Sequence, residues 1–209
     1  VVLSYAKYHF YLSRGIQIDM NNYKKLFVSN KRFEKQYGIK KEDLLKMFSY
    51  EKYQESANYI KNKLGEFKPK IAIILGSGLG VLSDEFDKKI VIKYSEIPNF
   101  PISTVEGHAG ELIIGLLNGV EVIAMNGRFH YYEGYDLKET TFPIRVFKLL
   151  GIEKLILTNA SGGINTNFVA GDFMVINDYL SFFAESVLRG KNLNEFGERF
   201  TDMSETFDK

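Results

Sequence analysis

The segment KIAIILGSGLG, residues 70–80, begins as a short run rich in β-branched residues and ends as a glycine loop. β-Branched side chains favour strands, whereas glycines allow the tight turn that follows. A loop of this kind lets backbone N–H groups approach an anion. Ser77 adds a hydroxyl donor within the loop. The segment therefore predicts a strand that ends in an anion-binding loop, with a simple strand-to-helix turn as the alternative.

The glycine loop departs from two nucleotide-binding motifs. A dinucleotide fingerprint requires G-x-G-x-x-G and an acidic residue at the end of the next strand. Here the third glycine comes one residue early, and Glu96 lies beyond the strand predicted over 90–94. A Walker A motif would continue with Gly-Lys-Ser/Thr, which does not follow Gly80. We therefore discount a dinucleotide site and a P-loop.

Further elements are predicted on both sides of this segment. Ser49 is a good N-cap, and apolar residues then recur at helical spacing until Gly65. Asn118-Gly119 is a strong hairpin signal between two apolar runs. A second helix is predicted over 140–150, and strands over 90–94, 111–117, 120–126, 154–158 (of the buried type) and 172–177. This alternation predicts an α/β fold with a mixed central β-sheet flanked by helices.

Composition excludes several classes of function. The 209 residues carry a net charge of only +1, whereas nucleic-acid-binding proteins usually show a strong basic excess. The chain has no cysteine, which excludes disulfides and thiolate metal sites, and its three histidines are too dispersed to suggest zinc. No signal peptide is visible, and the longest apolar stretch, 112–125, is interrupted by polar residues. We therefore expect a cytoplasmic protein that binds neither nucleic acid nor membrane.

The first 46 residues differ from the rest, because they are rich in Lys, Tyr and Asn and begin with Val. We expect an N-terminal extension that is non-native or poorly ordered. The Lys-Glu-Asp sequence just before Met47 is compatible with a purine-rich ribosome-binding sequence in the gene. Met47 is therefore a candidate natural start, and peptides from residues 1–46 in the native protein would contradict this.

Three more loops carry side chains suited to an anion and a sugar. Gly107-His108-Ala109-Gly110 presents an imidazole between glycines. Residues 127–134, GRFHYYEG, follow a predicted strand and combine Arg, His, Tyr and Glu. Arg offers a planar fork for two phosphate oxygens, and a His two residues away can lie on the same side. Thr158-Asn159-Ala160-Ser161-Gly162-Gly163 follows another strand, and ligands of α/β proteins bind at such strand ends.

With these loops in this order, the chain resembles the trimeric class of purine nucleoside phosphorylases from about Phe48 to Asp208. Besides the four loops, the resemblance is carried by Ile97-Pro98-Asn99-Phe100-Pro101, Thr141-Phe142-Pro143, Arg199-Phe200 and Met203-Ser204. It implies a nucleoside phosphorylase fold over residues 47–209. It also implies phosphorolysis of purine ribonucleosides and deoxyribonucleosides in purine salvage, with inorganic phosphate as co-substrate and no metal or organic cofactor.

The resemblance also implies roles for single residues. Phosphate would be held by Ser77, His108, Arg128, His130 and the backbone N–H of Ala160. Glu133 would anchor the phosphate-binding groups, so that the catalytic set is His108, Arg128, His130 and Glu133. Tyr132, Asn159 and Ala160 would line the ribose and purine. The family is usually a homotrimer in which an aromatic residue covers the ribose of the neighbouring subunit. Phe182 or Phe183 would be that residue, although its loop is shorter here.

The resemblance further implies that the family continues beyond Lys209. That segment supplies a Phe-Glu pair and an Asn at the purine, a Met-Ser pair at the ribose and phosphate, and a late His. We therefore expect a C-terminally truncated chain with an incomplete fold. Two alternatives remain open: a methylthioadenosine phosphorylase, whose usual loop has a proline near Tyr132-Glu133-Gly134, and an inactive fragment that binds phosphate at most.

Overall fold

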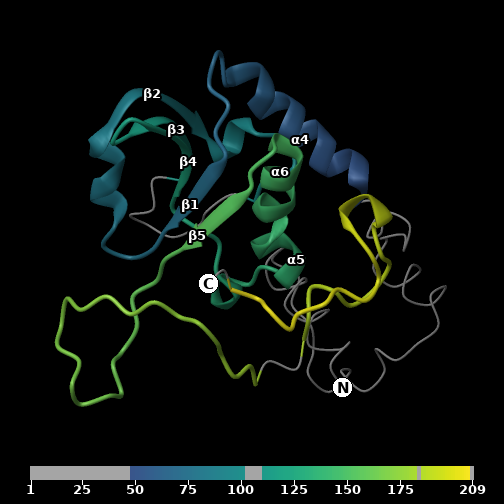
Figure 1. Cartoon of the computed structure of the whole chain (residues 1–209). Coiled ribbons are helices and arrows are strands. Elements are labelled where there is room, and N and C mark those ends of the chain that lie inside the picture. Colours follow the sequence, from purple (N-terminus) through teal and green to yellow (C-terminus); the bar gives the residue numbers. More distant parts are fainter. Residues whose placement is uncertain (1–47, 102–109, 183–184, 208–209) are drawn as a thin grey trace, which may run out of the picture.

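The computed structural model describes residues 48–101, 110–182 and 185–207. Its centre is a five-stranded sheet in the order β2-β3-β4-β1-β5 (Figure 1). The strands are β1 Ile71–Leu75, β2 Phe86–Lys93, β3 Glu111–Leu117, β4 Val120–Asn126 and β5 Lys154–Leu157. β1 runs parallel to β4 and β5, whereas β2, β3 and β4 are antiparallel neighbours. The predicted mixed α/β sheet is confirmed, and the expected extension 1–46 lies outside the described residues.

The helices match the predicted periodicity with one correction. α4 spans Tyr50–Lys63, with Ser49 at its N-cap, as predicted. The helix predicted over 140–150 is confirmed as α6 Phe142–Leu150, which begins two residues later than expected because a separate short helix, α5 Leu137–Thr140, precedes it and meets it at Thr141. The break has a local cause, because Pro143 lacks an N–H group and fits only the first turn of a new helix. The described residues also form 3₁₀ helices. The longest is η2 Gly80–Glu85, and the others are single turns: η3 Tyr94–Glu96, η4 Tyr131–Glu133 and η5 Asn194–Phe196.

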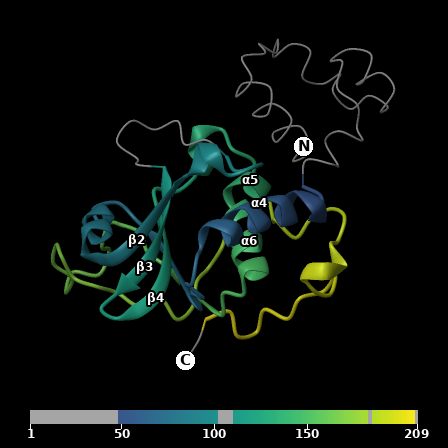
Figure 2. The ribbon, with the colours of Figure 1, turned by 90° about the horizontal axis from the view of Figure 1, so that it is seen from above.

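The main core lies between one face of the sheet and helices α4 and α6, which Figure 2 shows beside strands β2–β4. Tyr53 of α4 stacks on Phe142 of α6, and apolar side chains of four strands pack against both helices. A smaller cluster covers the opposite face, where Leu79 and Leu82 beside η2 pack against Leu75 and Ile113. Burial on both faces explains why β3 and β4 are almost continuously apolar. Within the described residues, none of the helices has the length and apolar character needed to span a bilayer.

Two predictions about the C-terminal third are wrong. β5 forms where a strand was expected, but all four of its residues are exposed instead of buried. β5 is an edge strand that pairs only with β1, so one side of it has no neighbour within the described sheet. Residues 172–177 form no strand, because they do not pair with the sheet, and Phe173 and Val175 are about nine-tenths exposed. An apolar run forms a strand only where a partner supplies the hydrogen bonds.

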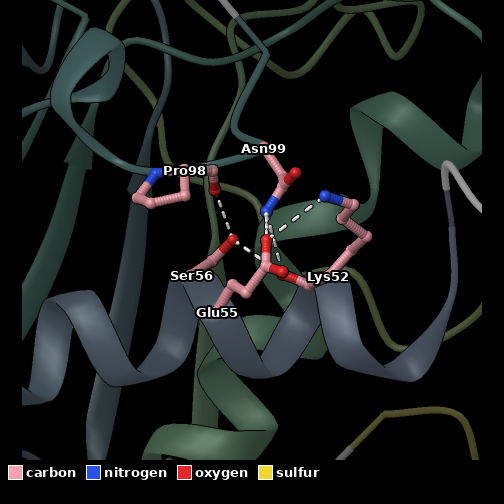
Figure 3. Close-up of polar contacts among 5 residues, drawn as sticks. All are labelled: Lys52, Glu55, Ser56, Pro98 and Asn99. Carbon is pink, nitrogen blue, oxygen red and sulfur yellow. Dashed lines mark hydrogen bonds and ion pairs between the residues drawn. The ribbon is translucent and has the colours of Figure 1, made fainter.

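A polar cluster fastens the chain after η3 to helix α4 (Figure 3). The hydroxyl of Ser56, which is fully buried, donates to the carbonyl oxygen of Pro98 at 2.5 Å. Asn99 has a positive φ of 63° and donates its amide to the Glu55 carboxylate at 2.8 Å. This bond and that from Lys52 lower the pKa of Glu55. The cluster fixes the residues that lead into the 102–109 segment, where His108 lies outside the described residues.

Replacing Ser56 with alanine should lower the free energy of unfolding by about 0.5–1.5 kcal/mol, because the hydrogen bond from this buried hydroxyl to the Pro98 carbonyl is lost. Urea denaturation followed by circular dichroism measures this change. Ser161→Ala is the matched control, since Ser161 is exposed and bonds only to its neighbour Gly162. Equal midpoints for the two variants would contradict the prediction.

Candidate functional site

Three of the four predicted loops begin at one edge of the sheet. β1, β4 and β5 are parallel, with Leu75 opposite Asn126 and Ile74 opposite Leu157. The loops that begin at Gly76, Gly127 and Thr158 therefore leave the sheet side by side. The carboxyl edge of parallel strands is where ligands of α/β proteins bind. The sheet topology thus brings together loops that are up to 82 residues apart in sequence.

Gly76 and Thr158 join the ends of β1 and β5. The Thr158 hydroxyl accepts the Gly76 N–H at 2.7 Å and donates to the Ile74 carbonyl at 2.8 Å. A Cβ atom at Gly76 would lie 2.6 Å from the Thr158 carbonyl oxygen and 2.8 Å from the Asn159 Cα. The first glycine of the loop is thus required by a backbone contact. Thr158 had no predicted role beyond its place in a loop, and a hydroxyl at a strand end was the only signal that could have indicated one.

Arg128, in the loop after β4, reaches the loop after β5. Its Nη1 donates to the Thr158 carbonyl at 2.7 Å, and its Nε donates to Nε2 of His130 at 2.9 Å. These bonds use two of the five N–H donors of the guanidinium, and the plane of the group is set by both. Arg128 is therefore oriented by a neighbouring strand and by its own loop.

Glu133 in turn orients His130. Its Oε1 accepts the His130 backbone N–H at 3.0 Å and lies 2.6 Å from Nδ1 of the imidazole. An Arg N–H can only donate, so Nε2 of His130 carries the lone pair and Nδ1 carries the proton that Glu133 accepts. The Glu133 side chain is 3% exposed, and a 3₁₀ turn with Gly134 at φ 95° closes this arrangement. Glu133, His130, Arg128 and Thr158 thus form a continuous hydrogen-bonded chain, the Arg128 network.

Nitrogen-15 NMR should find the proton of the His130 imidazole on Nδ1, because Glu133 accepts at that nitrogen and Arg128 donates at the other. Glu133→Ala should raise the fraction of the Nε2–H tautomer, because only the Arg128 bond then favours the Nδ1–H form. A predominant Nε2–H tautomer in the parent chain would contradict the geometry of the Arg128 network.

The remaining predicted residues lie around this edge or outside the described part. Ser77, Asn159 and Ala160 are exposed in the loops after β1 and β5. Tyr132 is 77% exposed, and its ring stacks on that of His130 with centroids 4.7 Å apart. Phe182 is 93% exposed, whereas His108 and Phe183 lie outside the described residues.

Neither a metal-ligand cluster nor the cavity between α4 and α6 involves the predicted site residues that the structure describes. In the part of the chain that the structure describes, no group of three His, Asp or Glu residues could hold a metal ion. A cavity of about 520 Å³ lies between α4, α6 and residues 187–201, and no predicted site residue lines it. Its basic residues are partly engaged, since Arg145 lies over the rings of Tyr53 and Phe196 and Arg199 donates to Gly190. The candidate site therefore lies at the carboxyl edge of the sheet, beside the Arg128 network.

Comparison with known proteins connects this edge to a family. The model of the phosphorylase superfamily matches residues 70–209. The chain is 55% identical over 159 residues to purine nucleoside phosphorylase 1 of Bacillus subtilis (strain 168), and this alignment covers 76% of this chain and 58% of that protein. It is 49% identical over 165 residues to purine nucleoside phosphorylase of Mus musculus, and this alignment covers 78% of this chain and 57% of that protein.

Solved structures agree with the sequence comparison. Isoform 2 of purine nucleoside phosphorylase from Schistosoma mansoni, in complex with cytosine and ribose-1-phosphate, superposes with a TM-score of 0.71 and 46% identity. The match covers 77% of this chain and 57% of that one. The chain thus spans somewhat more than half the length of the proteins it matches. The range matched by the family model, 70–209, contains every strand and loop of the candidate site.

Proposed function

Because the chain belongs to the phosphorylase superfamily, we propose that it is part of a purine nucleoside phosphorylase, a pentosyltransferase of purine salvage. The enzyme cleaves the N-glycosidic bond of purine ribonucleosides and deoxyribonucleosides with inorganic phosphate. The observation that carries the proposal is the Arg128 network at the edge where three loops meet. The names of relatives that are 49–55% identical support it.

Phosphate is held by Arg128, His130, Ser77, His108 and the backbone N–H of Ala160. The guanidinium supplies a charged fork, and its orientation by Thr158 and His130 reduces the entropy lost on binding. Donation from His130 to phosphate requires a proton on Nε2, which in the structure accepts from Arg128. Phosphate binding therefore rearranges the bond between Arg128 and Nε2, while the Glu133 carboxylate holds Nδ1 and fixes the orientation of the ring.

The bound phosphate is the nucleophile. One of its oxygens forms a bond to C1′ of the ribose as the bond from C1′ to the purine nitrogen breaks. The purine takes the electron pair of that bond and a proton, and ribose 1-phosphate or its deoxy analogue forms. The negative charge of the phosphate stabilises the oxocarbenium-like sugar, so catalysis is largely electrostatic and requires no metal or organic cofactor. The Schistosoma mansoni protein was crystallised with ribose-1-phosphate, which is the product expected here.

The other residues contact the nucleoside or a neighbouring subunit. Tyr132 lies against the ribose, and Asn159 and Ala160 lie at the wall of the ribose and purine. The exposed Tyr132 ring on His130 suits this role, because it is close to the phosphate groups and accessible. The enzyme is a cytoplasmic homotrimer in which Phe182 or Phe183 covers the ribose of an adjacent subunit.

The experiment compares inosine with methylthioadenosine as substrates of a protein carrying this sequence, with and without inorganic phosphate. We expect release of hypoxanthine from inosine only when phosphate is present, with ribose 1-phosphate as the second product. Preferred turnover of methylthioadenosine would reassign the substrate. Phosphate binding without turnover of either nucleoside would support a phosphate-binding protein that is not an enzyme.

A further inference from the structure

Tyr94 lies directly behind the loop that carries Arg128. It follows β2 at the start of η3, and it is 1% exposed. Its ring packs against Phe129 and Phe100, with centroids 5.2 Å and 5.7 Å away. Phe129 is the residue immediately after Arg128 and is itself buried. The Tyr94 ring therefore fixes the position of the chain on one side of Arg128.

The hydroxyl of Tyr94 fixes the chain on the other side of Arg128. It donates to the carbonyl oxygen of Gly127 at 2.6 Å, and both groups are buried. Gly127 has φ 103°, a conformation that favours glycine, so its carbonyl points in a direction set by a special turn. Arg128 is thus flanked by two residues, Gly127 and Phe129, that both contact Tyr94.

The backbone of Tyr94 joins this loop to a second one. Its N–H donates to the carbonyl of Gly110 at 2.8 Å, at the end of the segment that contains His108. A second hydrogen bond joins the same two segments: the Asn126 amide donates to the Glu111 carboxylate at 3.1 Å. Glu111 adjoins Gly110, and Asn126 adjoins Gly127. The ends of β3 and β4 are therefore connected by two sets of polar contacts, one of them through Tyr94.

The Tyr94 hydroxyl remains a donor under all ordinary conditions. Burial raises the pKa of Tyr94 well above its usual value, and the nearby Glu111 charge raises it further. The Gly127 carbonyl can only accept, so the bond between them has a fixed direction. Nothing in the sequence distinguishes Tyr94 from the other twelve tyrosines, because its role depends on contacts with residues 16 and 33 positions away.

We propose that Tyr94 is a positioning residue for phosphate, which holds Arg128 in its binding orientation through Gly127 and Phe129. This inference rests on the proposed function, in which Arg128 binds phosphate. Tyr94 itself does not contact phosphate. Loss of its hydroxyl leaves the guanidinium chemically intact but allows the loop to shift, and small displacements of binding groups have large effects on affinity and rate.

The first test measures the dissociation constant for inorganic phosphate by calorimetry in the parent chain, Tyr94→Phe and Tyr53→Phe. Tyr53 is the matched control, since it is equally buried and its hydroxyl interacts with Arg145, on the helical side of the core. We expect Tyr94→Phe to bind phosphate about tenfold more weakly, which corresponds to the net free energy of one hydrogen bond. Tyr53→Phe should bind like the parent, although both variants lose thermal stability.

The second test needs no phosphate and follows the Arg128 Nε–H signal by NMR. This proton lies in the bond to His130, so its chemical shift reports the orientation of the guanidinium. Tyr94→Phe should shift or broaden the signal, whereas Tyr53→Phe should leave it unchanged. If Tyr94→Phe does not fold, Phe129→Leu tests the same placement, because it removes the ring contact and keeps the hydroxyl bond.

Two outcomes would overturn the inference: an unchanged Arg128 signal and phosphate affinity in Tyr94→Phe, or equal changes in Tyr53→Phe. The failure of the proposed function is a different result. In that case the parent chain does not bind phosphate, and the NMR signal alone decides whether Tyr94 positions Arg128.

Discussion

Replacing Arg128 with alanine should weaken the binding of inorganic phosphate by at least about a hundredfold, because two charge-assisted hydrogen bonds contribute about 1.5–3 kcal/mol each. The loss extends beyond the guanidinium. Arg128 donates to Nε2 of His130 and to the carbonyl of Thr158, so its removal also releases the imidazole and one edge of the loop after β5. Calorimetry at fixed ionic strength measures the change.

Two further variants separate geometry from charge. Arg128→Lys keeps the positive charge but lacks the planar fork, so it should recover only a small part of the affinity. Arg189→Ala removes an equal charge from an exposed position outside the candidate site and should leave binding unchanged. Phosphate affinity in Arg128→Ala equal to that of the Arg189 variant would contradict the assignment of Arg128 to phosphate.

Replacing Gly76 with alanine should have the largest effect on folding, about 3 kcal/mol, near the upper end of the usual penalty for overpacking. The new Cβ would lie 2.6 Å from the Thr158 carbonyl oxygen and 2.8 Å from the Asn159 Cα. Both contacts are with backbone, so no side chain can rotate away. Relief requires separation of the ends of β1 and β5, which also breaks the bond from the Gly76 N–H to the Thr158 hydroxyl.

Thermal and urea unfolding measure this effect, with Gly162→Ala as the control. A Cβ at Gly162 would meet nothing within 4 Å, so that variant should unfold like the parent. The Gly76 variant should also lose phosphate affinity, because Thr158 orients Arg128 through its carbonyl. Equal unfolding midpoints for Gly76→Ala and Gly162→Ala would show that the strand ends can separate at little cost.

Local patterns were sufficient for most of the sheet and for α4. Apolar runs bounded by turn signals located β1, β3 and β4, and helical spacing after Ser49 located α4. These elements depend mainly on residues close together in sequence, which is why their positions could be predicted. The same reasoning wrongly predicted a strand over residues 172–177. A strand requires a partner strand, and the sequence does not show whether one is present.

The candidate site was predicted in its parts but not in its connections. Arg128, His130 and Glu133 were expected to act together because they share one loop. The bond from Arg128 to Thr158 was not expected. It joins the loops after β4 and β5, which are brought near each other only because both strands pair with β1. Tyr94 was missed for the same reason, since its contacts lie on β3 and β4 loops and not on its own strand.

The sequence by itself therefore determined the fold class, the loops rich in donors and the family to which they point. Only the tertiary structure decided that Gly76 must be glycine, that Thr158 orients Arg128 and that Tyr94 supports the loop from behind. The physical reason is that strand order and register are set by pairing between distant segments. The strand and glycine loop of residues 70–80 indicate that the chain has a ligand-binding loop. The strands that pair with this strand determine which other side chains meet there.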